Sequence, residues 1–404
     1  MISVEEAKRR ILAAFSPLPA ETVSVAEGLG RVLAEGLTAR VTQPPADVSA
    51  MDGYAVRAAD VTNVPVTLKQ IGRVPAGSTY DGTVGPGECV RIFTGAPLPP
   101  GTDTIIIQED VTADGDRITI REGAPKGRYV RPAGLDFRSG EVGIPAGRVL
   151  TVRDIGLAAA MNRPWLRVRR RPRVAIISTG DEVVMPGDPI GPSQIVSSNG
   201  LALAALVTAG GGEPIQLGIA PDSVEALQRM ADGARGADLL VTTGGASVGE
   251  HDLVRASLGA RGLEIDFWQI AMRPGKPLMF GRMGDTPVLG LPGNPVSSLV
   301  CATIFLMPVL ARLLGIEDKT PSRLTARLGR DLGPNDRRED YLRATLTTDA
   351  DGRLVATPFT TQDSSMLATL ARADCLVRRP PHAPAAKAGE IVDIVTFGHG
   401  IIRL

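Results

Sequence analysis

The spacing of apolar residues changes along the chain, and the changes mark out its parts. Between residue 172 and about residue 315, short apolar runs alternate with segments in which apolar residues recur at helical spacing. The runs are continuous, which is typical of strands buried on both faces of a parallel sheet. We therefore predict a doubly wound α/β domain with a largely parallel sheet over residues 172–318. Its predicted strands are 174–178, 215–219, 239–241, 264–271, 278–281 and 288–291, and its helices are 199–210, 223–233, 296–314 and one after Asp252.

Two other stretches show only short strands separated by Gly and Pro. The first covers residues 43–141 and the second covers residues 319–404. Regular short strands with this punctuation predict small β domains. We expect the second one to be a C-terminal β-barrel-like domain. The predicted strands are 66–71, 88–92, 104–108, 117–120 and 127–130 in the first stretch, and 324–328, 340–347, 354–358 and 391–397 in the second.

The remaining segments, 1–42 and 142–171, share a pattern and are predicted to form one N-terminal framework, split by the inserted β domain. Ser3 and Glu6 form a capping box for a first helix. A second helix is predicted at 152–161. We also expect a short strand at 23–25 and, from Gly30 to Leu33, a segment that begins as a helix.

Three of the predicted buried strands end in turns made of small, polar, Gly or Pro residues. The carboxyl ends of parallel strands meet at one edge of a sheet, where ligands bind in open α/β folds. A Gly pair lets backbone N–H groups approach a ligand, although such a turn can also be a plain connection. Arg273 and Lys276 add two cations in a stiff turn, so a phosphorylated ligand with a divalent metal is suggested. The three turns are 179–182, 242–245 and 292–295.

Composition narrows the class of protein. Lys plus Arg number 44 and Asp plus Glu number 44, so the chain lacks the basic footprint of a nucleic-acid-binding protein. The cysteines, at 89, 301 and 375, match neither a disulfide framework nor a zinc spacing. The acidic N-terminus is unlike a signal peptide, and no apolar run approaches the ~20 residues of a membrane span. We expect a soluble, cytoplasmic protein that binds neither nucleic acid nor a membrane.

Six motifs, taken in order, resemble those of the MoeA family of molybdopterin molybdenumtransferases, to which the E domain of gephyrin is related. Each motif alone has little specificity, but six in the correct order are highly specific, and they cover nearly the whole chain. The motifs are Ser49–Ala55, Ile92–Pro97, Ser178–Glu182, Thr243–Asp252, Arg273–Pro277 and Leu291–Ser297.

The resemblance implies four domains, with a central domain similar to the MoaB and MogA proteins and an elongated framework that mediates dimerisation. It implies a homodimer whose site lies between the α/β domain of one subunit and domains of the other. The implied reaction takes up adenylylated molybdopterin and molybdate and releases AMP with the help of Mg²⁺. Molybdopterin supplies the sulfur ligands, so the chain needs no Cys cluster. The molybdopterin adenylyltransferase and acceptor molybdoenzymes are possible partners.

The resemblance also assigns roles to single residues. Asp222 and Asp252 correspond to the magnesium carboxylates, because a hard cation that bridges phosphates prefers oxygen ligands. The pattern alone favours a structural role for two of these residues. It predicts that Asp222 is the N-cap of a helix and that Thr94 belongs to a simple turn. The positions that the family treats as catalytic are Asp52, Thr94, Asp136 and Glu182.

Two further sets are assigned to the substrates. Molybdate is a tetrahedral dianion, which calls for cations, N–H groups and hydroxyls. Arg338 and Arg343 also fit a charged strand face. The residues expected to bind molybdopterin are Thr243, Gly244, Gly245, Ser247, Pro292, Gly293, Asn294 and Pro295. Those expected to bind molybdate are Arg273, Lys276, Ser297, Arg338, Arg343, Ser364 and Ser365.

Three positions depart from the family pattern. Arg273 stands where many relatives have Lys, and its forked contacts differ from those of an ammonium group. Leu135 stands where many have Glu, and Ser197 where Asp is usual. No nucleophilic triad is evident, which favours metal-assisted attack by water or molybdate over a covalent intermediate. Two other functions stay open: a non-catalytic molybdopterin-binding scaffold, and a related enzyme acting on a nucleotide pyrophosphate.

Overall fold

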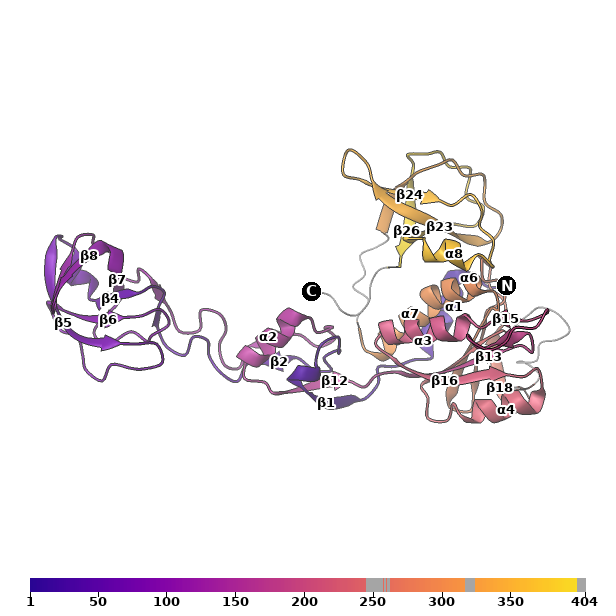
Figure 1. Cartoon of the computed structure of the whole chain (residues 1–404), viewed down its shortest axis with the longest axis horizontal. Coiled ribbons are helices and arrows are strands. Elements are labelled where there is room, and N and C mark those ends of the chain that lie inside the picture. The colour runs from indigo at the N-terminus through magenta and orange to yellow at the C-terminus, as the bar shows by residue number, and fades with distance from the viewer. Residues whose placement is uncertain (245–256, 258, 260–261, 317–323, 398–404) are drawn as a thin grey trace. The chain divides into compact units, whose positions relative to one another are not determined.

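The computed structural model describes residues 1–244, 257, 259, 262–316 and 324–397 (Figure 1). The chain forms two compact units, each described here by itself. The first comprises Met1–Glu35, Ala146–Val152 and Arg167–Leu404. The second comprises Gly36–Pro145 and Arg153–Leu166. The division into four domains at residues 42, 141, 171 and 318 stays a prediction.

A six-stranded sheet is the centre of the first unit. Four neighbouring strands are parallel, and β20 and β18 continue the sheet in antiparallel fashion. Three of the parallel strands, β13, β17 and β21, carry continuous apolar runs buried on both faces, whereas the edge strand β16 is largely half-buried or exposed. The sheet order is β16 (Glu213–Ala220), β13 (Arg173–Thr179), β17 (Leu239–Thr243), β21 (Thr286–Leu291), β20 (Met279–Met283) and β18 (Leu263–Phe267).

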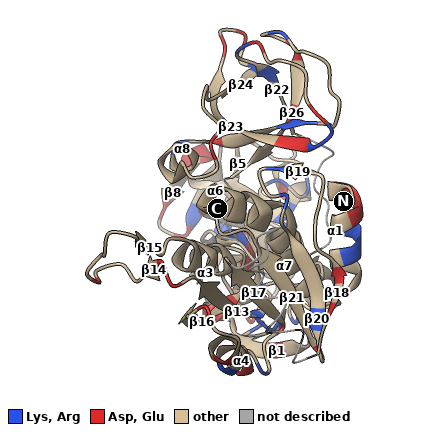
Figure 2. Ribbon diagram, turned by 90° about the vertical axis from the view of Figure 1, so that its right-hand side faces the viewer, with Lys and Arg blue, Asp and Glu red and all other residues tan. Residues whose placement is uncertain are grey.

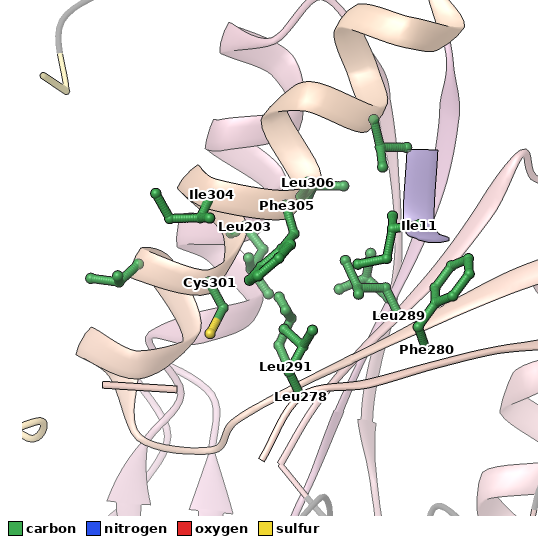
Figure 3. Packing of buried hydrophobic residues seen from close by; sticks show 14 of the residues in the cluster. Ile11, Leu203, Leu278, Phe280, Leu289, Leu291, Cys301, Ile304, Phe305 and Leu306 are labelled. Atoms are coloured by element: carbon green, nitrogen blue, oxygen red, sulfur yellow. The ribbon is translucent and has the colours of Figure 1, made fainter. Parts of the chain in front are cut away.

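Helices cover both faces of this sheet. On one face, side chains of α1 (Val4–Ala13), α3 (Asn199–Ala209) and the long helix from Pro295 to Leu313 share one core with the strands (Figure 3). On the other face, α4 (Val224–Asp232) packs over a smaller core. The doubly wound α/β arrangement predicted from the sequence is therefore confirmed. Helix α1 lies in the core of this domain, although it is the first element of the chain.

The helix from Pro295 to Leu313 consists of α6 (Pro295–Cys301), a π-helical turn (Ala302–Leu306) and α7 (Met307–Leu313). The π turn immediately precedes Pro308, which has no N–H for the regular helical bond. At 19 residues this helix is apolar and long enough to cross a membrane, so the expectation that no apolar run approaches that length was wrong. Its side chains pack in the core, with Phe305 only 1% exposed, which accounts for the composition.

The C-terminal strands close into a ring. In order they are β23 (Glu339–Thr348), β24 (Leu354–Pro358), β22 (Leu324–Leu328), β26 (Ile391–Thr396) and β25 (Cys375–Arg379), and β25 pairs again with β23. The expected barrel-like domain is thereby confirmed. A two-residue strand from the α/β domain, β19 (Met272–Arg273), pairs with the start of β23. The short helix α8 (Leu367–Ala371) lies between β24 and β25.

The second unit contains the inserted β domain. Its six-stranded sheet has the order β7 (Thr104–Ile107), β4 (Gly53–Val56), β6 (Glu88–Ile92), β5 (Val66–Val74), β9 (Arg117–Ile120) and β8 (Val111–Asp114). Both faces bury apolar side chains. The shorter pairs in this unit are β2 (Leu37–Thr38) with β11 (Val142–Ile144) and β3 (Val48–Ser49) with β10 (Val130–Arg131), and α2 is Val152–Ala160.

The first strand, β1 (Ala20–Ser24), pairs with β12 (Trp165–Arg169). The helical start expected from Gly30 to Leu33 is wrong. Gly30 has a φ of 72°, and Val32 and Leu33 form bridges to residues far along the chain. Ser3 caps α1 as predicted, but the Glu6 carboxylate accepts hydrogen bonds from Arg9 and Arg10, so only half of the capping box is seen.

Candidate functional site

The three turns predicted to share one edge of the sheet do so. In the sheet register Ser178 lies opposite Thr243, and Thr243 lies opposite Leu291. The turns that follow these residues therefore begin at the same level. Thr179 is opposite Ala220, so the segment carrying Asp222 also starts at this edge.

Gly244 brings two of these turns into contact. Its φ is 90°, a conformation that side chains rarely adopt, and a Cβ at this position would lie 2.6 Å from the carbonyl oxygen of Thr179. On its other side, a Cβ on Gly293 would lie 3.4 Å from the Gly244 Cα. The backbone approach at Thr179 is so close that only glycine fits at position 244, whereas the contact at Gly293 is an ordinary van der Waals distance. Gly245, Ser247 and Asp252 lie outside the described residues.

Asn199 ties the edge together, and our reading of the sequence missed it as a site residue. Its amide donates to the hydroxyl of Thr243 at 2.9 Å and to the carbonyl of Gly293 at 2.7 Å. The Thr243 hydroxyl is also 3.2 Å from the carbonyl of Pro292. Asn199 therefore fixes the ends of two strands from the start of α3. The available signal was an amide side chain at the first position of a predicted helix, two positions after Ser197, which departs from the family pattern.

Carboxylates gather at one side of this edge. Asp222 is exposed, and its backbone N–H donates to the carboxylate of Asp181 at 2.9 Å. The alternative interpretation of Asp222 as an N-cap is wrong, since Ser223 caps α4 by accepting from Ala226 N–H. Glu182 folds its carboxylate back over Gly180. Within the described ranges, no group of three His, Cys, Asp or Glu residues could hold a metal ion.

Arg273 is engaged by carboxylates rather than left free. Its guanidinium donates to Asp340, to Asp336 at 3.2 Å and to the Asn335 amide oxygen at 3.1 Å. The bond to Asp340 raises the pKa of Arg273. Burial raises the pKa of Asp340, and the Arg273 hydrogen bond opposes that rise. Arg338 is likewise paired with Asp336 at 3.0 Å.

Lys276 is placed by its neighbour Gly275. Gly275 has a φ of 114°, and a Cβ there would overlap the sulfur of Cys301 in α6. The loop therefore lies directly against α6, whose first turn contains the buried Ser297. No ion pair holds the Lys276 ammonium among the described residues.

The barrel contributes the remaining residues. Asn294 donates to the Ser364 hydroxyl at 2.9 Å, and Val296 N–H donates to the Ser364 carbonyl at 3.1 Å. Arg343 is 1% exposed, and its side chain donates to the Gln362 amide oxygen and the Met366 carbonyl. Burial lowers the pKa of Arg343. Ser365 donates to Asp363 at 2.6 Å and is exposed.

In the inserted domain, the structure joins two of the predicted catalytic residues. Thr94 donates to the carboxylate of Asp52 through its backbone N–H at 2.8 Å and its hydroxyl at 2.7 Å, although 42 positions separate the two. These bonds lower the pKa of Asp52. Asp136 is exposed, and no hydrogen bond or ion pair of its carboxylate is found among the described residues. Its backbone N–H donates to Gln43.

Comparisons with known proteins match this arrangement. The sequence model of the MoeA N-terminal region (domain I and II) matches residues 2–162. A probable molybdopterin binding domain matches residues 175–312, and the MoeA C-terminal region (domain IV) matches residues 325–397. A molybdopterin molybdenumtransferase from Haemophilus influenzae is 33% identical over 99% of both chains. This chain belongs to the MoeA family.

Other MoeA relatives agree. A molybdopterin molybdenumtransferase from Nostoc is 39% identical over 80% of this chain and 76% of its own. A solved MoeA structure from Pyrococcus horikosii superimposes with a TM-score of 0.87 at 34% identity, covering 99% of this chain and 100% of that one. A second, from Pyrococcus horikoshii, gives 0.85 at 26% identity over 98% and 100%. The MoeA fold thus extends over the whole length compared.

Proposed function

We propose that this MoeA protein transfers molybdenum from molybdate to adenylylated molybdopterin, releasing AMP. The observation that carries the proposal is the convergence on α6. At the start of this helix the predicted molybdopterin turn meets the Ser364 segment of the barrel, and the Lys276 loop lies against Cys301 at the other end of the same helix. A phosphorylated substrate and an oxyanion would be bound side by side at such a place.

The oxyanion pocket needs positive charge that is not already neutralised. Lys276 and Arg343 meet this requirement, because neither has a carboxylate hydrogen-bonded to it among the described residues. Ser297 and Ser364 add hydroxyls. Arg273 and Arg338 share their charge with Asp336 and Asp340. We assign these two arginines to positioning the loops rather than to direct contact with molybdate, in contrast to the role that the resemblance implies.

The strand edge would hold the other substrate. Backbone N–H groups of the turns at Gly244 and Gly293, set by Asn199, would bind its phosphate and pterin groups. A side chain at position 244 would collide with the Thr179 carbonyl and move this turn. Asp52, Thr94, Asp136 and Glu182 stay proposals as catalytic residues.

Magnesium is part of this proposal. The carboxylate of Asp222 is exposed at the sheet edge and does not cap α4. Carboxylate oxygens are ligands that Mg²⁺ prefers. Asp222 would hold the ion together with Asp252. A bound divalent cation would neutralise charge that develops on the phosphate oxygens. We further propose that the protein acts in the cytoplasm as a homodimer, in contact with the adenylyltransferase and acceptor molybdoenzymes.

The test is AMP release from adenylylated molybdopterin, measured with and without molybdate and Mg²⁺. Release should require both additions. Asp222→Asn should reduce the rate at least about 100-fold, because one metal carboxylate is lost. Asp188→Asn is the control, since it removes an exposed carboxylate from the same domain and should leave the rate unchanged.

Two results would contradict the proposal. Tight substrate binding with no release under any condition would make the protein a molybdopterin-binding scaffold. Release that ignores molybdate would make it a nucleotide pyrophosphate hydrolase.

A further inference from the structure

A cluster of arginines and aromatic rings lies on one face of the inserted β domain. Tyr54 on β4, Arg91 on β6 and Arg73 on β5 occupy matching positions in three neighbouring strands. Matching positions project side chains from the same face of a sheet. Phe93 follows two residues after Arg91 and extends the row towards Thr94. We propose that this face binds a phosphoryl anion through Arg73 and Arg91.

Both guanidinium groups are held in place by rings. Arg73 lies over Phe93, with its Cζ 4.8 Å from the ring centroid. Arg91 lies 5.1 Å from Phe93 and 5.0 Å from Tyr54. Stacking fixes a guanidinium without using its N–H groups, which lie in its plane and stay available to an acceptor. Two forked donors are thus ordered before any ligand arrives.

Neither arginine is neutralised by a carboxylate. Arg73 has no hydrogen bond or ion pair within the described part of the chain, and Arg91 donates to the neutral oxygens of Gly53 and Gln108. Asp52 accepts hydrogen bonds from both donors of Thr94, which lower its pKa, and the charge of Arg91 helps to lower that pKa, but no hydrogen bond or ion pair joins Asp52 and Arg91 among the described residues. Two other cations of this domain are ion-paired, Arg57 with Asp60 and Lys126 with Asp103. The cluster therefore keeps an excess of positive charge.

The chemistry of these donors selects the ligand. Planar, forked guanidinium groups match the paired oxygens of a phosphate better than any neutral acceptor. Two of them suit a dianion or a diphosphate. In naming the phosphoryl groups of adenylylated molybdopterin as the natural ligand, the inference rests on the proposed function. The anion site itself does not depend on that reaction.

Calorimetric titration of the full-length chain tests the site, with pyrophosphate, inorganic phosphate and AMP as separate probes. Wild type should bind pyrophosphate, and Arg73→Gln should bind it at least about 10-fold more weakly, because one forked contact is lost. Arg91→Gln should also weaken pyrophosphate binding. Arg73→Lys should recover part of the affinity, since it restores the charge without the fork.

Arg128→Gln is the matched control. Arg128 stacks on Tyr129 at 4.4 Å in the same domain and donates to its hydroxyl, but it lies outside the cluster. Its substitution should leave pyrophosphate binding unchanged. Equal affinity in wild type, Arg73→Gln and Arg91→Gln would overturn the inference. If phosphate binds more tightly than pyrophosphate, the site takes a terminal phosphate; the reverse order assigns it a diphosphate.

Enzyme kinetics separate this inference from the proposed function. Arg73→Gln should raise the KM for adenylylated molybdopterin about 10-fold and leave the KM for molybdate unchanged. Wild type that releases no AMP, yet binds pyrophosphate in an Arg73-dependent manner, would refute the proposed function and support the anion site. AMP release with an unchanged KM in Arg73→Gln, together with unchanged pyrophosphate binding, would refute the anion site and leave the reaction standing.

Discussion

Two regions of the first unit hold arginine in opposite ways. At β19, Arg273 is surrounded by acceptors: two carboxylates and an amide oxygen. On β23, Arg343 is fully buried on the face opposite the barrel core, and among the described residues only the neutral oxygens of Gln362 and Met366 accept from its side chain. Burial lowers the pKa of Arg343, whereas hydrogen bonding to Asp340 raises the pKa of Arg273.

This difference in hydrogen-bond partners indicates that Arg273 has a structural role, whereas Arg343 could still bind an anion. The charge of an ion-paired arginine is already neutralised within the fold. A buried arginine without a hydrogen-bonded carboxylate is desolvated and not neutralised, so an anion binds to it with a larger gain in free energy. Lysine and arginine residues therefore cannot be ranked as oxyanion ligands by their presence in a motif alone. Figure 2 shows basic and acidic residues next to one another on α1, where Arg9 and Arg10 pair with Glu6.

The largest expected effect is on molybdate affinity in Arg343→Met. The substitution removes an unfavourably desolvated cation but takes a donor from the Gln362 and Met366 oxygens, so the free energy of unfolding should fall by about 1–3 kcal/mol. Molybdate binding, measured by calorimetry, should fall at least about 100-fold, since a desolvated charge–charge contact is lost.

Arg378→Met is the matched control for that variant. Arg378 belongs to the same barrel, but it forms a two-pronged pair with Glu339 at 2.8 and 3.0 Å. Its loss should destabilise the fold, because Glu339 is left buried and less well paired, and should spare molybdate affinity. If the two variants lose molybdate binding equally, the contrast between paired and unpaired arginines fails.

The next effect is on stability in Arg273→Met. Asp340 is 4% exposed, and one of its oxygens already has no hydrogen-bond partner within the described residues. Removing its ion-pair partner should cost about 1–3 kcal/mol in denaturant unfolding. Arg273→Lys should recover only part of this, because one ammonium group cannot reach three acceptors in a forked geometry.

The same variant should change how stability depends on pH. Burial raises the folded pKa of Asp340, so the folded state gains protons more readily than the unfolded state as the pH falls. Without Arg273 that pKa rises further. The deficit of Arg273→Met relative to wild type should therefore shrink on acidification through the raised pKa and grow towards neutral pH. A deficit that does not vary with pH would exclude Asp340 as its source.

The smallest effect concerns Thr94→Val. The hydroxyl bond to Asp52 is lost while the backbone N–H bond stays, so the pKa of Asp52 should move back towards its ordinary value. A carboxyl titration followed by NMR measures this shift. Thr94→Ser should restore the lowered pKa. An Asp52 pKa unaffected by either substitution would contradict the hydrogen-bonded pair.

Much of the fold follows from local patterns. The predicted bounds of β6, β9, β22 and β24 agree with the structure, because each strand is a distinct apolar or alternating run between Gly and Pro. The two-residue strand β19 could not be predicted, since its pairing partner is more than 60 positions away. The helical start at Gly30 failed for the same reason: long-range bridges override local helical spacing.

The site shows the same limit. The turns at one sheet edge could be predicted, because parallel strands must end together. The pairing of Arg273 could not, since Asn335, Asp336 and Asp340 come from a different domain. Asn199 could have been predicted as a site residue, because it is an amide side chain at the first position of a predicted helix. Sequence patterns thus locate the edge, while the electrostatic state of each cation depends on contacts made only in the folded chain.

The pairing of β19 with β23 has a consequence for biosynthesis. Met272 and Arg273 leave the ribosome well before their partners Glu339 and Asp340. Domains form during synthesis roughly in the order in which they emerge. The α/β domain can therefore fold while the loop carrying Lys276 still lacks its anchor. The proposed oxyanion pocket would be complete only when the barrel closes, so a nascent chain that stalls before β25 would have a folded α/β core without the barrel residues of that proposed pocket.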